Sequence, residues 1–446
     1  MPQQLRSLTS FNHYPVQTAS LIRPEIYRQL NHFTGPTISR GLGSSYGDAA
    51  LNQEAQVILM ERLDRILAFN AQTGSITCEA GLSLDKLLQF IVPKGWFIPV
   101  TPGTAYVSLG GCFASDVHGK NHHRVGSFAQ HVSALELITS SGQAVYCSPE
   151  KNSELFWATA GGMGLTGIIG QITLQLIPIT TAYMYVRYFA SHDLEQTFMY
   201  LNSEPYDDLY HVAWLDLLNA PLGRGIVMAA RHASLELLPA YLQTNALNNT
   251  HSASLSLPMY FPNWFLHKQV GKQFNRLYYQ CLRKKTAPFI THYRRYFYPL
   301  DRIKHWGKLY GTRGFIQYQC VLPQTSAQQT TKILLELIQN SSYPVLLATL
   351  KRLGTGNDAP LSFAAPGFTL ALDIPILDPG LFLLLQKLDQ HVIEANGKIY
   401  LAKDARLTPQ AFRDMYPHYN RWLTIKRSVD PQNLFSSSLS RRLQLC

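Results

Sequence analysis

The pattern of hydrophobic and polar residues changes near residue 180, and the part before it alternates strand-like and helix-like segments. Alternating apolar residues at 57–60, 75–80 and 132–139 predict strands, because every second side chain of a half-buried strand faces the core. Apolar residues between 82 and 92 follow a 3.6-residue repeat instead, which predicts a helix with Ser83 as its cap. This mixture is typical of an α+β nucleotide-binding unit.

After residue 180, longer strand-like segments alternate with amphipathic ones. The expected strands cover 182–189, 211–217, 225–231, 315–322 and 368–374, and the expected helices cover 194–201 and 326–338. Such a pattern favours a second unit, an antiparallel sheet backed by helices. Further helices are expected at 408–415 and 438–445, near the end of the chain.

The part before residue 180 contains glycine-rich turns, and these are the first candidates for a functional site. Arg40–Asp48 holds three glycines directly after a short strand signal, so its backbone N–H groups can converge on a phosphate. It lacks the Gly-Lys-Ser/Thr of a Walker loop. Gly110–His123 combines small residues with three histidines, a lysine and an aspartate, and Gly161–Ile169 is a third such turn. Small residues allow a ligand to approach the backbone closely, and we expect these turns to meet on one extended ligand.

Composition and charge narrow the class of protein. Hydrophobic residues make up 46% of the 446 residues and charged ones only 15%, as in an ordered globular protein. The net charge of +11 predicts attraction to polyanions such as anionic lipid, a phosphorylated substrate or nucleic acid, unless the surface is simply basic. The six scattered cysteines form no CxxC pair, which favours a reducing compartment over a zinc site or a disulfide scaffold.

Residues 256–305 interleave aromatic and cationic side chains. Such a stretch can stack bases, lie at a lipid headgroup boundary, or hold a phosphate beside an apolar chain. It can equally be an aromatic core edged by solvated arginines. Since no nucleic-acid-binding signature accompanies it, we expect no nucleic-acid partner.

Several motifs resemble the vanillyl-alcohol-oxidase, or PCMH-type, family of FAD-binding oxidoreductases. Within it the chain is most similar to the decaprenylphosphoryl-β-D-ribose 2′-oxidase branch. The resemblance covers essentially the whole chain. It rests on Arg40–Asp48, Thr101–Gly103, Asp116–His123, Gly164–Ile169, Gln317–Gln319, Pro360–Phe363, Tyr400–Asp404 and the ending from Val429 to Arg442.

The resemblance implies a two-domain fold. Residues 1–180, completed by 398–446, would form the FAD-binding domain, and 181–397 the inserted substrate-binding domain. Related oxidases often tether FAD through a histidine of the glycine-rich loop. Here Tyr46 follows Ser44 and Ser45, and the loop has no histidine, so we expect non-covalent FAD.

The resemblance also assigns residues to the site. Those expected against FAD are Ser39, Arg40, Gly41, Leu42, Gly43, Ser44, Ser45, Tyr46, Gly47, Asp48, Ala49, Gly103, Ser108, Leu109, Gly110, Gly111, Ser115, Asp116, Val117, His118, Ile169 and Tyr400. Those expected in the substrate pocket are Gln317, Gln319, Lys351 and Tyr298.

The implied reaction moves a hydride from a secondary alcohol carbon to flavin N5. It needs a closely held carbon, a proton acceptor, and positive charge near the flavin. Lys403 is expected to orient the hydroxyl and offset the charge, with His118 and Lys120 as contacts for hydroxyl or phosphate. His118 suits the pH range of a general base, but the base stays unassigned. His122 and His123 are interpreted as structural, and no metal site is expected.

Lys351, Lys120 and the cations of 283–295 are rival contacts for a lipid phosphate. Mycobacterial members of the branch carry a cysteine at the position of Ala371, so no thiol is needed for the chemistry here, and the pocket wall differs.

We therefore expect oxidation of the 2′-hydroxyl of a polyprenylphosphoryl ribose to a 2′-keto product, which a separate short-chain dehydrogenase would reduce. We expect the protein to be cytoplasmic, either free or peripheral at the inner membrane, since the sequence shows neither a signal peptide nor a transmembrane segment. Two alternatives stay open. One is a soluble aldonolactone or alditol oxidase; the other is a non-catalytic basic protein with a flavin fold that binds lipid or nucleic acid.

Overall fold

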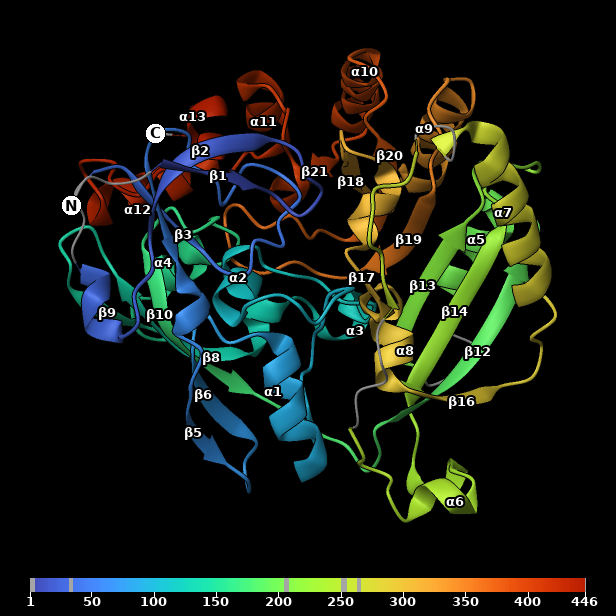
Figure 1. Cartoon of the computed structure of the whole chain (residues 1–446), viewed down its shortest axis with the longest axis horizontal. Coiled ribbons are helices and arrows are strands. Elements are labelled where there is room, and N and C mark those ends of the chain that lie inside the picture. The colour runs from blue at the N-terminus through green and yellow to red at the C-terminus, as the bar shows by residue number, and fades with distance from the viewer. Residues whose placement is uncertain (1–4, 32–34, 204–207, 250–254, 263–265, 446) are drawn as a thin grey trace.

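The computed structural model describes residues 5–31, 35–203, 208–249, 255–262 and 266–445. Figure 1 shows two groups of elements: small sheets with the last helices on one side, and one large sheet on the other. The mixture of sheets and helices confirms the α+β prediction. The predicted division at 180 and 398 stays a prediction.

Two small sheets form the first group. The four-stranded sheet has the order β1-β2-β4-β3, and the five-stranded sheet the order β5-β6-β10-β8-β9. Their strands are β1 (Leu5–Thr9), β2 (Val16–Ile22), β3 (Thr37–Arg40), β4 (Gln56–Leu59), β5 (Ile66–Asn70), β6 (Ser75–Glu79), β8 (Val132–Ile138), β9 (Ala144–Cys147) and β10 (Ile168–Gln175). The glycine-rich loop Arg40–Asp48 begins at the end of β3, and the glycine-rich turn Gly161–Ile169 leads into β10.

The large sheet has eight strands in the order β16-β12-β14-β13-β19-β20-β18-β21, and all its pairs are antiparallel. The strands are β12 (Tyr183–Ser191), β13 (Tyr210–Leu215), β14 (Gly225–His232), β16 (Phe289–His292), β18 (Phe315–Pro323), β19 (Leu347–Leu353), β20 (Gly367–Pro375) and β21 (Lys398–Ile399). Two short pairs complete the strands, β7 (Trp96–Phe97) with β11 (Ile177–Pro178) and β15 (Leu255–Ser256) with β17 (Ile303–Lys304).

The helices surround these sheets. They are α1 (Leu84–Ile91), α2 (Leu109–Ala114), α3 (His122–Val125), α4 (Ser153–Thr159), α5 (Leu194–Asn202), α6 (Ala240–Gln243), α7 (Lys268–Leu282), α8 (Tyr293–Phe297), α9 (Ala327–Gln339), α10 (Gly380–Glu394), α11 (Pro409–Met415), α12 (Tyr419–Val429) and α13 (Ser438–Arg442). The predicted cap of α1 is confirmed, because the Ser83 hydroxyl accepts from the Lys86 N–H at 3.1 Å. In the described part of the chain, no helix is both long and apolar enough to cross a bilayer.

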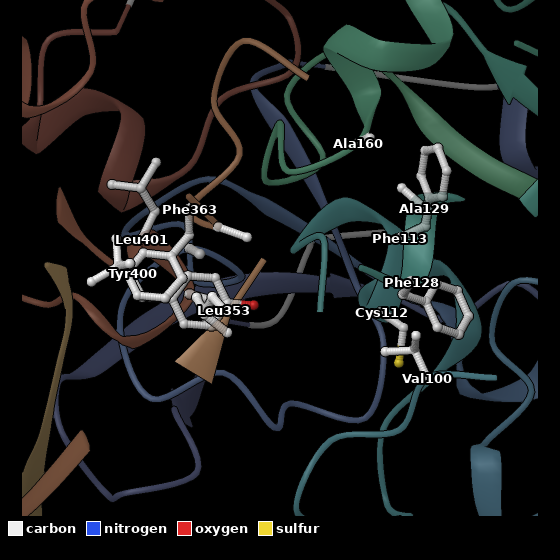
Figure 2. Packing of buried hydrophobic residues seen from close by; sticks show 14 of the residues in the cluster. Val100, Cys112, Phe113, Phe128, Ala129, Ala160, Leu353, Phe363, Tyr400 and Leu401 are labelled. Carbon is white, nitrogen blue, oxygen red and sulfur yellow. The ribbon is translucent and has the colours of Figure 1, made fainter. Parts of the chain in front are cut away.

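The core runs continuously behind both groups. Figure 2 shows Tyr400 and Leu401 beside Phe363, and Cys112 and Phe113 beside Phe128. The centroids of the Tyr400 and Phe363 rings lie 4.6 Å apart, so the C-terminal segment packs on the loop between β19 and β20. Lys403, three residues later, is thereby held in place.

Candidate active site

A cavity of about 470 Å³ lies between the glycine-rich turns and the large sheet. We call the turn side the cofactor wall; its lining residues come from 39–50, 101–120 and 163–169. We call the sheet side the substrate wall; its lining residues come from β13, β14, β18, β19 and β20. The two walls carry different chemistry.

The cofactor wall is held in shape from behind by the end of the chain. The Tyr46 N–H donates to the Ala402 carbonyl at 3.0 Å, and a Cβ on Gly47 would lie 1.7 Å from the Asp404 carbonyl oxygen. Only glycine allows this approach. Arg442 pairs with Asp48 at 2.7 Å and with Asp404 at 2.9 Å, so one guanidinium joins the glycine-rich loop to the segment that carries Lys403.

A second part of this wall runs from 101 to 118. Ser108 caps α2 by accepting from the Gly111 N–H at 3.3 Å. Asp116 is buried at a φ of 42° and accepts from Ser362 at 2.7 Å and Asn357 at 2.8 Å. Its carboxylate therefore fixes the loop from behind instead of facing the cavity.

This wall fits FAD. Glycines and serines bring backbone close to a bound group over an extended length. The Nδ1 of His118 is buried and has no hydrogen-bond partner among the described residues, which a bound group in the cavity would satisfy.

The substrate wall is one face of the large sheet. Cross-strand partners Gln319, Ala371, Thr349 and Trp214 form a row over four strands, and all four line the cavity. Side chains directly opposite each other share a face. The same face carries Lys351, two residues beyond Thr349.

Lys403 faces the cavity at the junction of the two walls. Its Nζ lies 3.5 Å from the centroid of the Tyr46 ring. Burial lowers the pKa of Lys403 to about 7, with the Asp373 carboxylate opposing this shift and Lys351 adding to it. Burial also raises the pKa of Asp373 to about 6, against hydrogen bonds from Gln317 at 2.6 Å and Tyr310 at 3.3 Å.

His118 meets Gln319 across the cavity edge. The Gln319 Nε2 donates to the His118 Nε2 at 2.9 Å and to the Thr369 hydroxyl at 3.0 Å. Burial, then Lys351 and the other nearby cations, hold the pKa of His118 well below its usual value. The ring is therefore neutral, and the lone pair of its Nε2 already accepts a hydrogen bond.

Two further lysines face the cavity. The Lys120 ammonium donates to the Tyr296 carbonyl at 2.5 Å and lies 4.1 Å from the centroid of the Tyr296 ring. Burial, with Lys351, lowers the pKa of Lys120 to about 7, and burial lowers that of Lys351 to about 8. Within the described residues, the Lys351 ammonium has no hydrogen-bond or ion-pair partner. Such a cation is suited to an anionic ligand.

The far end of the cavity is apolar. Trp214, Met228 and Leu347 line it, together with Tyr278 from α7. The Trp214 and Tyr278 rings meet edge to face at 4.8 Å. An uncharged chain would be bound here beside the lysines.

Most residues predicted for the site line this cavity, from both walls. They are Ser39, Gly41, Leu42, Gly43, Ser44, Ser45, Tyr46, Ala49, Gly103, Ser108, Gly110, Gly111, Ser115, Val117, His118, Lys120, Ile169, Gln317, Gln319, Lys351, Tyr400 and Lys403.

Six predicted residues lie outside the lining: Arg40, Gly47, Asp48, Leu109, Asp116 and Tyr298. Each is engaged in holding a wall or in the core. The Arg40 guanidinium donates to the Thr9 carbonyl at 2.7 Å, and the Tyr298 hydroxyl bonds that of Thr101 at 2.6 Å. Leu109 is buried in the core.

Sequence reasoning missed the apolar end and Asp373. No local pattern marks them, because they meet the lysines only through pairing of distant strands. The one usable signal was alternation: Trp214 and Asp373 both lie in segments expected to be strands.

His122, His123 and Arg294 lie outside the cavity lining and contact other residues. The His122 Nδ1 accepts from the Gly354 N–H at 3.0 Å, and the His123 ring stacks on that of His211 at 5.0 Å. Arg294 pairs with Asp85 at 2.6 Å. These placements agree with the structural interpretation of His122 and His123.

The 256–305 segment divides into two parts. Tyr293, Phe297 and Tyr298 are core residues, as expected if the segment is an aromatic core. Phe274 and Leu277 of α7 are exposed instead. Residues 263–265, part of the aromatic motif, lie outside the described residues.

Comparisons with known proteins show the family to which the chain belongs. The family model described as FAD binding domain matches residues 24–148, and that described as D-arabinono-1,4-lactone oxidase matches residues 315–443. The chain is 39% identical to the decaprenylphosphoryl-beta-D-ribose oxidase of Mycolicibacterium smegmatis, over 92% of this chain and 89% of the relative.

Two other relatives are more distant. The L-gulono-1,4-lactone dehydrogenase of Mycobacterium tuberculosis is 20% identical over 90% of this chain and 89% of its own. The L-gulonolactone oxidase of Bos taurus is 31% identical over 31% of each chain. The long match at 39% identity decides the family. The chain belongs to the decaprenylphosphoryl-β-D-ribose oxidase family of FAD-dependent oxidoreductases that act on CH–OH groups.

Proposed function

We propose that the protein oxidises the 2′-hydroxyl of a polyprenylphosphoryl ribose to the 2′-keto sugar lipid. One observation carries the proposal: three lysines face a cavity that has a glycine-rich wall at one side and an apolar end at the other. Cofactor, sugar phosphate and prenyl chain each find a matching surface in this order. The 39% identity to a decaprenylphosphoryl-beta-D-ribose oxidase supports the same substrate class.

FAD would be held by the cofactor wall, its phosphates against the N–H groups of the loop from Gly41 to Tyr46. A bound flavin would supply the hydride acceptor, and its reduced form would carry negative charge. Non-covalent attachment is supported by the chemistry of the wall. Its one thiol, Cys112, is buried, and burial raises its pKa, while His118 already bonds Gln319.

We assign to Lys403 the role of the base that accepts the hydroxyl proton. With a pKa of about 7, a large fraction of its side chain is a neutral amine at neutral pH, and a neutral amine can accept a proton. The ammonium that forms then offsets negative charge at the cofactor. Lys403 thus serves the charge role expected from the sequence and fills the unassigned role of base.

We assign to His118 the role of orienting the sugar or the cofactor, and not the role of removing the hydroxyl proton. Its Nε2 lone pair accepts from Gln319, so removal of a proton by this nitrogen would first break a buried hydrogen bond. The free Nδ1–H can donate to the sugar or to the cofactor.

The phosphate would lie at Lys351, with Lys120 beside it. Within the described residues no acidic side chain pairs with Lys351, and a phosphodiester would supply the missing charge. Lys120 is already fixed by the Tyr296 carbonyl, which orients its remaining donors. The cations near 283–295 do not line the cavity, so they are weaker candidates.

The proposal extends to partners and place. A 2′-keto sugar lipid needs a reductase to complete an epimerisation, and a separate short-chain dehydrogenase suits that step. A substrate anchored in lipid requires the enzyme to meet a membrane surface, and we propose a peripheral location on the cytoplasmic side.

Anaerobic mixing with substrate tests this function. We expect the flavin absorbance near 450 nm to bleach with a synthetic prenylphosphoryl ribose and not with free polyols or aldonolactones, because only the former offers the phosphate and chain. Bleaching by L-gulonolactone or D-arabinonolactone alone would instead establish the lactone oxidase alternative, to which the second family match points.

A further inference from the structure

Outside the cavity, the surface of α7 combines exposed apolar side chains with cations. The segment from 237 to 300 contains eight Lys and Arg residues and no Asp or Glu. Helix α7 (Lys268–Leu282) lies in its middle and runs along the outer flank of the large sheet, away from both termini (Figure 1). Much of the chain's net charge of +11 is therefore gathered in one region.

One face of α7 packs on the sheet, and another presents apolar side chains to solvent. The inward residues are Gly271, Asn275, Tyr279 and Leu282, at helical spacing. Phe274 is 62% exposed and Leu277 is 65% exposed. Exposed apolar side chains grouped at such spacing, with no described element covering them, mark a binding surface.

Cations border this apolar stripe. Lys272 and Arg276 are exposed on α7, and Arg283 and Lys284 follow directly after it. None of the four side chains has a hydrogen-bond or ion-pair partner within the residues that the structure describes. A helix with Phe and Leu on one side and Lys and Arg beside them is typical of helices that lie in the headgroup region of an anionic bilayer.

The stripe is continuous with the apolar end of the cavity. The Phe274 ring stacks on the Tyr278 ring at 5.9 Å and 10°, and Tyr278 meets Trp214 at 4.8 Å. Tyr278 and Trp214 line the cavity, whereas Phe274 does not. A row of aromatic rings thus leads from the exposed surface of α7 to the place where a prenyl chain would lie.

We propose that α7 is the membrane-docking helix. It lies in the surface of an anionic bilayer through Phe274 and Leu277, its cations meet the lipid headgroups, and the prenyl chain of the substrate passes from the bilayer into the cavity along Tyr278 and Trp214. The assignment of the prenyl chain rests on the proposed function; the membrane contact itself does not.

Co-sedimentation of the full-length holoenzyme with vesicles tests the contact. The vesicles are of phosphatidylcholine, with or without phosphatidylglycerol. We expect binding to the anionic vesicles that salt weakens. The Lys272→Gln/Arg276→Gln pair should weaken it about thirtyfold, at about 1 kcal/mol per cation, and Phe274→Ser/Leu277→Ser should also weaken it strongly.

Helix α10 offers matched controls. Leu383 is 64% exposed there, and Lys387 is exposed one turn away. Leu383→Ser/Lys387→Gln should leave vesicle binding unchanged. Equal binding by the α7 and α10 variants would overturn the proposal, as would concentration-dependent self-association that the α7 variants abolish while vesicle binding persists.

Turnover separates this proposal from the proposed function. The Phe274→Ser/Leu277→Ser variant should oxidise a short-chain, water-soluble prenylphosphoryl ribose at the wild-type rate, and lose most of its turnover of a long-chain substrate embedded in anionic vesicles. If wild-type flavin is not reduced by either substrate, the proposed function fails while the vesicle assay still decides the docking. If the variant matches the wild type on embedded substrate, passage of the chain along α7 is wrong.

Discussion

The cofactor wall and the substrate wall of the cavity are built in opposite ways. The cofactor wall presents mostly backbone and small side chains, and buried ion pairs such as Asp48–Arg442–Asp404 hold it from behind. The substrate wall presents individual side chains on rigid strands, among them Lys351. We therefore infer that the cofactor is held mainly by the shape of the backbone, whereas the substrate is recognised by individual side chains. Substitutions in the cofactor wall should therefore affect FAD binding, and those in the substrate wall should affect substrate binding.

Lys403 should give the largest effect, because it acts where the walls meet. We expect Lys403→Met to lower kcat by roughly three orders of magnitude while FAD stays bound, since a general base contributes about 10²–10⁴-fold. Stopped-flow flavin reduction measures the rate, and the flavin spectrum of the purified variant is the control. Full turnover by this variant would remove Lys403 from the chemistry.

The pH profile should follow the same amine. Below a pKa of about 7 the Lys403 side chain is an ammonium and cannot accept a proton, so kcat at saturating substrate should rise with pH up to about 7 and then level. The ratio kcat/KM should fall again above about pH 8, because the Lys351 ammonium that binds the phosphate then loses its charge. His118 is neutral throughout this range, because its pKa lies well below its usual value. A profile that falls as pH rises through 7 would show that the ammonium form is the active one.

Arg442→Met should instead damage the cofactor wall. Removing one partner of a buried ion pair costs about 3–5 kcal/mol, because Asp48 and Asp404 are left buried without their cation. We expect a lower free energy of unfolding and partial loss of FAD, read by urea denaturation and by the flavin-to-protein absorbance ratio. Arg427→Met, on the exposed side of α12, is the matched control and should change neither.

Lys351→Met should affect the substrate wall alone. A hydrogen bond to a charged group contributes about 1.5–3 kcal/mol, so KM for a prenylphosphoryl ribose should rise about ten- to hundredfold with FAD content unchanged. Steady-state kinetics checks this expectation. An unchanged KM would move the phosphate to Lys120, and Lys120→Met, tested in parallel, would then show the increase.

Trp214→Leu should give the smallest effect, of about 1 kcal/mol or a few-fold in KM, seen with long prenyl chains and not with short ones. Paired assays with two chain lengths measure it. An equal loss for both lengths would place Trp214 beside the sugar.

Whether a helix or strand could be predicted depended on the strength of its local sequence pattern. The glycine-rich loop, the strands β6, β8 and β18 and the capped helix α1 have strong local signals, and all were predicted correctly. Helix α7 was missed because its glutamines, tyrosines and cations hide the apolar repeat, and α10 was also missed. Strands β1 and β2, at Leu5–Thr9 and Val16–Ile22, were not predicted either.

For the candidate site, motifs indicated most of the residues that line the cavity, while contacts between distant residues are the basis of the roles that we propose. The bond from Gln319 to His118 joins positions 201 residues apart, and no local pattern contains it. The same holds for Asp373 near Lys403, and for the aromatic path from Phe274 to Trp214. Charge, by contrast, was already visible, because the acid-free stretch 237–300 around α7 overlaps the aromatic and cationic segment 256–305 identified from the sequence.

Anaerobic flavin reduction with specifically deuterated prenylphosphoryl ribose tests the central claim most directly. If hydride leaves C2′, deuterium at C2′ should slow the reductive phase several-fold, while deuterium at C3′ should leave it unchanged. A slowing by deuterium at C3′ alone, or no flavin reduction by the lipid-linked sugar, would contradict the account.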